Sequence, residues 1–206
     1  MTDEELTKGI KIILLGESGV GKTNLIRVAT GEEFEQNSMT SSSGSYKEGI
    51  YTSAKKKKYL YHLWDTAGQE VYRSLNKIFI KNAKIVIFVY AIDNETSFKE
   101  LHFWIDLAKN ELGDEFIMGL VGNKIDLYEE QQVKEEVAIE FAKRQNIKYK
   151  ATSALTEPLG FKCFVEELLQ DYIKKYDSSS QDETDENGFP LKNGGENQEK
   201  KEKRCC

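Results

Sequence analysis

The chain has 206 residues, of which 39% are hydrophobic and 31% are charged, and its formal net charge is −6. This length suits one well-filled domain with a tail better than two full domains, and the acidic balance gives no general reason to expect nucleic acid as a partner. The three cysteines have neither the number nor the spacing of a disulfide framework or a zinc site, which indicates a reducing compartment.

Strand-like and helix-like segments alternate along the chain. Strands are expected at residues 10–15, 84–92, 116–122 and 147–151, with another that ends at Trp64 and a hairpin partner for it at 45–53. Helices are expected after Thr23 and at 97–112, 133–144 and 161–176. This alternation predicts an α/β fold, with a mostly parallel sheet covered by helices on both faces.

The composition changes at about Asp177. The segment that follows has few apolar residues and many Ser, Gly, Asn, Asp and Glu residues, so it cannot bury enough surface to fold. We therefore expect one domain at 9–176 and a disordered tail at 177–206.

The first motif is GESGVGKT, residues 16–23, between the first strand and a helix. This is the context that a G-x-x-x-x-G-K-[ST] phosphate loop requires, and an ordinary glycine turn is the less favoured alternative. Its backbone N–H groups would bind phosphate oxygens, Lys22 would reach the β- and γ-phosphates, and the Thr23 hydroxyl would ligate Mg²⁺.

Two further motifs follow predicted strands. In NKID, residues 123–126, Asp126 can accept two hydrogen bonds from the N1–H and 2-amino groups of guanine, which adenine cannot match. In WDTAGQE, residues 64–70, Asp65 can hold Mg²⁺ through water, the Gly68 N–H can meet the γ-phosphate, and Gln69 can orient an attacking water.

With these motifs in this order, the chain resembles the small GTPases of the Ras superfamily from about residue 9 to 176. It is most similar to the Rab family, on the evidence of GESGVGKT, the YRSL after WDTAGQE, SFKELHFWID and a terminal Cys-Cys. The resemblance implies a P-loop fold with a six-stranded sheet and five helices. It also implies GTP and GDP binding with Mg²⁺, and hydrolysis that is slow without a GTPase-activating protein.

The resemblance extends to individual site residues. Phe34 matches an aromatic residue that packs on guanine, and Asn123 matches the residue that ties the base loop to the phosphate loop. Leu155 departs from the usual lysine after Ser-Ala, which removes a side chain from the base. The nucleotide-binding residues expected in all are Ser18, Gly19, Val20, Gly21, Lys22, Thr23, Asn24, Phe34, Gly68, Asn123, Lys124, Asp126, Ser153, Ala154 and Leu155.

The serine-rich segment, residues 38–49, is the largest departure from the Rab pattern. Ser41 falls where the family has a Thr that ligates Mg²⁺ in the GTP state, and Thr40 could take that role after a one-residue shift. Serines and a glycine cost more entropy to order than the family's apolar residues. The segment is therefore expected either to order only with a partner or to be a loop that has fallen out of use, the first being favoured.

The chain ends in KKEKRCC, where Cys205 and Cys206 fit the double prenylation that the Rab resemblance implies; free thiols are the alternative. Two lipid chains and neighbouring basic residues would hold the protein on an anionic surface. We expect a monomeric switch on the cytosolic face of an internal membrane, with a cytosolic pool. Its expected partners are an exchange factor, an activating protein, a GDP-dissociation inhibitor and effectors of vesicle traffic. The alternative function is a membrane scaffold that binds nucleotide but has little regulated hydrolysis.

Overall fold

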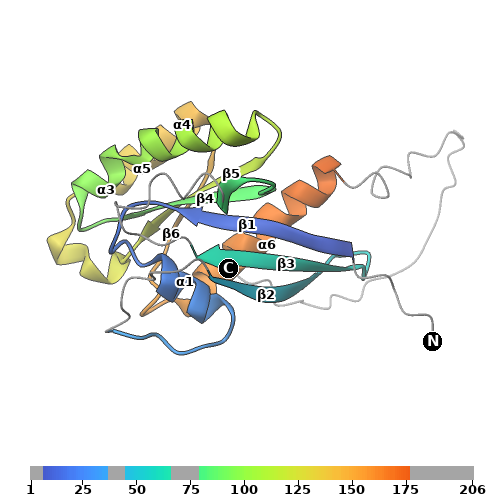
Figure 1. Cartoon of the computed structure of the whole chain (residues 1–206). Coiled ribbons are helices and arrows are strands. Elements are labelled where there is room, and N and C mark those ends of the chain that lie inside the picture. The colour runs from blue at the N-terminus through green and yellow to red at the C-terminus, as the bar shows by residue number, and fades with distance from the viewer. Residues whose placement is uncertain (1–6, 37–44, 66–78, 177–206) are drawn as a thin grey trace, which may run out of the picture.

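The computed structural model describes residues 7–36, 45–65 and 79–176 (Figure 1). In chain order its elements are β1 (Thr7–Leu15), α1 (Lys22–Ala29), β2 (Ser45–Thr52), β3 (Lys58–Asp65), β4 (Ile85–Ala91), α3 (Glu95–Lys99), α4 (Leu101–Leu112), β5 (Ile117–Asn123), the 3₁₀ helix η2 (Ile125–Glu130), α5 (Glu135–Gln145), β6 (Lys148–Ala151) and α6 (Pro158–Tyr176).

The strands form one six-stranded sheet in the order β2-β3-β1-β4-β5-β6. β2 pairs with β3 in antiparallel register, and the other neighbours are parallel. The predicted α/β class and the edge hairpin are therefore confirmed. Every side chain of β4 is buried, as its continuous run of apolar residues predicts for a strand covered on both faces.

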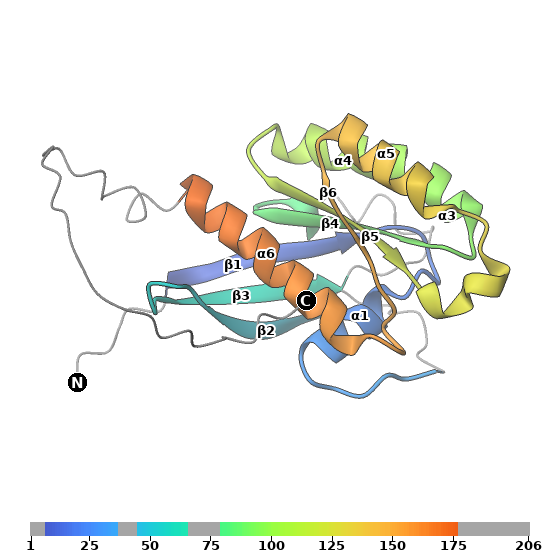
Figure 2. The ribbon, with the colours of Figure 1, turned by 180° about the vertical axis from the view of Figure 1, so that it is seen from behind.

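Helices cover both faces of the sheet (Figures 1 and 2). On one face α1 and α6 pack over Ile12 and Leu14 of β1. On the other face α4 and α5 pack over Ile13 and Leu15, the alternate residues of the same strand. The chain thus builds two apolar cores that share the sheet.

The helix expected at 97–112 is instead two helices, α3 and α4, which meet at Glu100. The first starts earlier than expected because Asn94 caps it, accepting a 3.0 Å hydrogen bond from the Ser97 amide. Glu100 has a φ of −71° and a ψ of −7°, still in the right-handed helical region but rotated from the regular α-helical ψ, which interrupts the helix for one residue. No helix in the described part of the chain has both the length and the apolar composition needed to cross a membrane.

The carboxyl ends of the parallel strands lie along one edge of the sheet, where ligands bind in open α/β folds. Gly16 follows β1, Asp65 ends β3, Asn123 ends β5 and Thr152 follows β6. The fold therefore collects at this edge the motifs that are far apart in the sequence.

Candidate functional site

The phosphate loop, residues 16–23, curls tightly against the ends of β4 and β5. Gly16 has a φ of 152°, and a Cβ there would lie 2.1 Å from the Val89 carbonyl oxygen. Gly21 has a φ of 94°, and its Cβ would lie 2.3 Å from Asn123 Nδ2. Both positions therefore require glycine. The start of α1 follows directly, and the amino-terminal end of a helix favours a bound phosphate.

Lys22 is buried inside this loop, with only 5% of its surface exposed. Its ammonium group donates hydrogen bonds of 2.7 Å to the carbonyl oxygens of Gly16 and Glu17. Burial lowers the pKa of Lys22 to about 8, although the negative charges of Asp65 and Glu17 oppose the shift. A phosphate group would bring further negative charge next to this buried cation.

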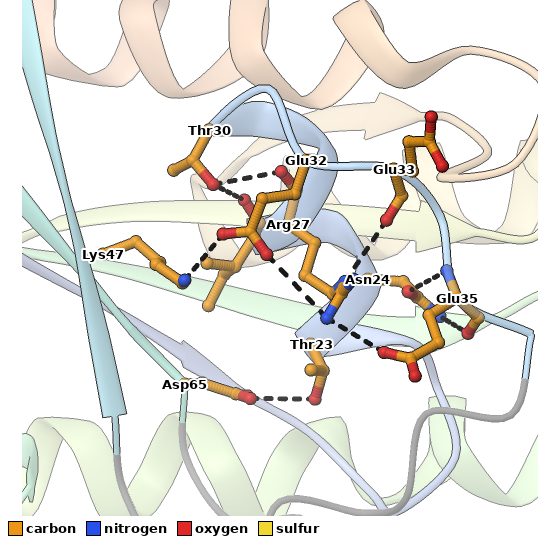
Figure 3. Close-up of polar contacts among 10 residues, drawn as sticks. Thr23, Asn24, Arg27, Thr30, Glu32, Glu33, Glu35, Lys47 and Asp65 are labelled. Carbon is orange, nitrogen blue, oxygen red and sulfur yellow. Dashed lines mark hydrogen bonds and ion pairs between the residues drawn. The ribbon is translucent and has the colours of Figure 1, made fainter.

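Thr23 and Asp65 face each other across the start of α1 and the end of β3. The Thr23 hydroxyl donates a 2.8 Å hydrogen bond to Asp65 Oδ2 (Figure 3). A hydroxyl and a carboxylate are the hard oxygen ligands that Mg²⁺ takes together with phosphate and water oxygens. Within the three described stretches, no group of three or more His, Cys, Asp or Glu side chains could hold a metal. This oxygen pair fits Mg²⁺.

Asn123, at the end of β5, links two loops. Its side chain is 2% exposed and donates a 2.8 Å hydrogen bond from Nδ2 to the Val20 carbonyl oxygen of the phosphate loop. Its Oδ1 accepts a 3.3 Å hydrogen bond from the Ala154 amide. One buried amide thus fixes the segment after β6 relative to the phosphate loop.

Asp126 and Ser153 lie together beyond β5 and β6. The Ser153 hydroxyl donates a hydrogen bond to Asp126 Oδ1 and accepts hydrogen bonds of 3.1 Å from the amides of Leu155 and Thr156. Ser153 is buried and Asp126 is half-buried. The Asp126 carboxylate is therefore held in place at the edge where the guanine acceptor is expected.

The other expected base contacts are more open. Lys124 Nζ lies 3.4 Å from Asp93 Oδ2. The backbone of Lys124 has a φ of 67°, which turns the chain sharply after β5. The Leu155 side chain is 54% exposed. This side chain lies next to the turn at Ser153 and has no polar group that could hydrogen-bond to a nucleotide base.

Phe34 lies in the stretch that follows α1. Two side chains of that helix, Asn24 and Arg27, hydrogen-bond to the backbone of this stretch. The Phe34 ring is half-buried and packs on the core beneath α1. Asn24 is buried and exchanges two hydrogen bonds with the backbone of Glu35, of 3.0 and 3.1 Å. The sequence analysis names Asn24, which directly follows the motif at residues 16–23, only as an expected nucleotide-binding residue, whereas the structure gives its side chain a specific contact.

Several expected site residues lie outside the described residues. These are Thr40, Ser41, Gly68, Gln69, Cys205 and Cys206. Their metal, catalytic and lipid roles stay predictions from the sequence.

Sequence reasoning missed Glu17, the second residue of the phosphate loop. It is 8% exposed, and its Oε1 accepts a 3.1 Å hydrogen bond from Trp104 Nε1 of α4. Trp104 lies in the helix expected at 97–112, where the spacing of apolar residues places it on the buried face. A charged residue inside a phosphate loop was the available signal, but its partner is 87 residues away.

Comparisons with known proteins agree with this geometry. The Ras family profile matches residues 11–175. The chain is 37% identical over 150 residues to Ras-related protein Rab-21 of Geodia cydonium, covering 73% of this chain and 65% of that protein. It is 33% identical to Ras-related protein Rab-18 of Lymnaea stagnalis, over 84% of this chain and 85% of that protein.

A third relative, Ras-related protein YPTC6 of Chlamydomonas reinhardtii, is 30% identical over 99% of this chain and 97% of its own length. The relatives do not favour the scaffold alternative, because all three carry the Ras-related name. The chain therefore belongs to the Ras family and is a Rab-like small GTPase.

Proposed function

We propose that the carboxyl edge of the sheet binds GTP and GDP with Mg²⁺ and that residues 9–176 form the complete nucleotide-binding domain. The contact that best supports this is the Asn123 side chain, which joins Val20 of the phosphate loop to Ala154. A phosphate site and a base site are thereby held at a fixed separation, as recognition of a nucleotide requires.

The phosphate end of the nucleotide is assigned to Lys22 and the loop amides. The Lys22 ammonium exchanges its two carbonyl partners for β- and γ-phosphate oxygens. Thr23, Asp65 acting through water and, in the GTP state, Ser41 would hold Mg²⁺. When bound, the ion would supply positive charge to offset that of the phosphates.

Hydrolysis is assigned to a water that Gln69 orients. The water oxygen bonds to the γ-phosphorus as the bond to the β–γ bridging oxygen breaks, and the Gly68 N–H binds a γ-phosphate oxygen. Because hydrolysis is expected to be slow in the isolated protein, an activating protein would supply an arginine to the γ-phosphate. Gln69→Leu should then lower single-turnover hydrolysis, measured as phosphate release, and leave GDP affinity near that of wild type.

Membrane attachment is assigned to prenylation of Cys205 and Cys206 at the end of a tail formed by residues 177–206. Two lipid chains give stable but peripheral anchoring to the cytosolic face of an internal membrane. A GDP-dissociation inhibitor would maintain the cytosolic pool, while an exchange factor and effectors act on a monomer. The double variant Cys205→Ser, Cys206→Ser should appear in the soluble fraction, and not in the membrane fraction, when cells are fractionated.

The most direct test of the guanine assignment is Asp126→Asn, which replaces one carboxylate oxygen of this side chain by an amide NH₂ group. Xanthine carries a carbonyl oxygen where guanine has its 2-amino group. In Asp126→Asn the side-chain amide can donate to that oxygen, but it cannot accept both guanine donors. We expect GDP affinity to fall by a factor on the order of 10²–10⁴ and xanthosine diphosphate affinity to rise. Unchanged GDP affinity in calorimetry would refute the assignment, and the gain for the second nucleotide excludes misfolding.

A further inference from the structure

Three glutamates flank Phe34 in the sequence of the stretch that follows α1. Glu32, Glu33 and Glu35 lie within four residues of one another, so their like charges repel unless cations lie nearby. Arg27, from the last turn of α1, and Lys47, from β2, supply those cations (Figure 3).

Arg27 makes three contacts with this stretch. Its Nε donates a 3.2 Å hydrogen bond to the Glu33 carbonyl oxygen, and its Nη1 lies 2.9 Å from Glu35 Oε2 and 3.8 Å from Glu32 Oε2. A planar guanidinium can serve these groups together, whereas the single ammonium of a lysine cannot. Arg27 therefore holds the backbone before Phe34 and the side chain after it.

Asn24 lies three residues before Arg27, on the same face of α1. Its two hydrogen bonds to the Glu35 backbone fix the chain immediately after Phe34. Two neighbouring side chains of one helix thus hold the chain directly before and directly after Phe34.

Lys47 extends this network to the sheet. Its Nζ lies 2.6 Å from Glu32 Oε1, while the other oxygen of that carboxylate faces Arg27. The charges alternate in one continuous row of Lys47, Glu32, Arg27 and Glu35, which we call the charged strap. Hydrogen bonding to Lys47 is the main cause that lowers the pKa of Glu32.

The charged strap joins two segments on either side of residues 37–44. Glu32 precedes that stretch and Lys47 follows it, so their contact closes a loop of the chain. Holding both ends of a loop lowers the entropy lost when the residues between them order. This matters here because the serine-rich segment has little apolar surface with which to order itself.

We propose that Arg27 and Lys47 are positioning residues that hold Phe34, the ring expected on guanine, and the chain on either side of residues 37–44 through the charged strap, and thereby slow release of the guanine nucleotide. This inference rests on the proposed function, since it concerns residence of the nucleotide in that site. The side chains of the strap are 30–50% exposed, so each pair alone contributes little and salt weakens it. The strap is therefore an adjustable latch, and an exchange factor could open it by competing for its charges.

The test measures release of a fluorescent GDP analogue from the full chain with Mg²⁺ present. Arg27→Ala should release the analogue about fivefold faster, and Arg27→Lys should fall between that variant and wild type. The matched control is Arg144→Ala, which removes another helical arginine that pairs with a glutamate but lies on α5. The control should release the analogue at the wild-type rate.

A double-mutant cycle tests the second contact. Glu32→Gln and Lys47→Met should each speed release about two- to threefold, and the double variant should be no faster than either single variant. Raising the salt concentration should speed release from wild type more than from Arg27→Ala. A purely structural role would lower the melting temperature without changing these rates.

Three results are decisive. Release from Arg27→Ala at the wild-type rate, or fully additive effects in the cycle, would overturn the strap while leaving the nucleotide site intact. If Arg27→Ala does not fold, the same decision comes from Glu35→Gln and from the cycle. Failure of the wild-type chain to bind the GDP analogue would overturn the proposed function and the strap together.

Discussion

The phosphate loop and the stretch around Phe34 flank the same helix, α1, yet they are held in different ways. Two buried side chains fix the loop: Lys22 of the loop itself, which is 5% exposed, and Asn123 at the end of β5, which is 2% exposed. Partly exposed ion pairs hold most of the stretch around Phe34, and their side chains are 30–50% exposed. Buried contacts keep their strength in salt, whereas exposed pairs lose theirs.

The difference separates a constant part of the site from an adjustable one. A loop fixed by the sheet should keep its shape in both nucleotide states, because changing it would leave buried polar groups without partners. Exposed ion pairs, such as those around Phe34, can break and re-form with only a small change in free energy. We therefore expect nucleotide binding to depend on the first region and its regulation on the second.

The largest effect should come from Lys22→Met, which keeps the length of the side chain but removes its charge. Losing a buried cation that pairs with phosphate should weaken GDP binding by a factor of about 10²–10³. Calorimetry measures the affinity, and circular dichroism verifies that the chain folds. The control, Lys99→Met, removes an exposed lysine of α3 and should bind GDP normally. Normal binding by Lys22→Met would show that the buried cation does not meet phosphate.

The next effect should come from Asn123→Ala. The Val20 carbonyl and the Ala154 amide would lose their buried partner, so the free energy of unfolding should fall by about 2–3 kcal/mol. Urea denaturation without nucleotide measures it, with the exposed Asn110→Ala of α4 as control. Equal stability of the two variants would mean that the two loops are positioned independently.

The pH dependence of GDP binding should follow Lys22. Its pKa is about 8 in the nucleotide-free protein, and nearby phosphates raise it, so binding takes up a proton above that pH. Affinity should be flat below pH 7 and then fall, with a limiting slope of about tenfold per pH unit, as pH rises to about 8.8. A flat profile from pH 7 to 8.8 would contradict the pKa assignment.

The same pKa makes an opposite prediction for stability without nucleotide. Between about pH 8 and 10.5 the unfolded chain binds the Lys22 proton better than the folded protein does. This contribution to the unfolding free energy therefore rises with pH through that window.

A smaller effect is expected from Trp104→Phe, which keeps the ring packing but removes the hydrogen bond to Glu17. The loss should be about 1 kcal/mol of unfolding free energy, because one hydrogen bond to a charged acceptor is removed. GDP release should quicken slightly, since Glu17 belongs to the phosphate loop. No change in either quantity would make Trp104 a packing residue only.

The sequence predicted where the motifs of the candidate site lie in the fold. The phosphate loop, Asp126 and Ser153 each follow a strand, and parallel strands bring their carboxyl ends to one edge. Because each motif directly follows a predicted strand, its place at this edge of the sheet could be predicted. The break at Glu100 was missed because the apolar pattern continues through it.

Pairings between distant polar residues could not be predicted. Glu17 and Trp104 are 87 residues apart, and each has an ordinary alternative as a loop or core residue. Arg27 and Lys47 are among 29 basic residues in a chain with 35 acidic ones, so the sequence does not say which pairs form. Those pairings depend on how α1 and β2 approach each other in the folded chain.

Hydrogen exchange of the backbone amides tests the contrast between the two regions most directly. The protein would be measured with Mg²⁺ and either GDP or a non-hydrolysable GTP analogue, comparing residues 20–25 with residues 33–35 and 38–49. We expect residues 20–25 to be equally protected in both states, and the other two segments to gain protection with the analogue. Equal exchange of residues 33–49 in the two states would contradict a working switch.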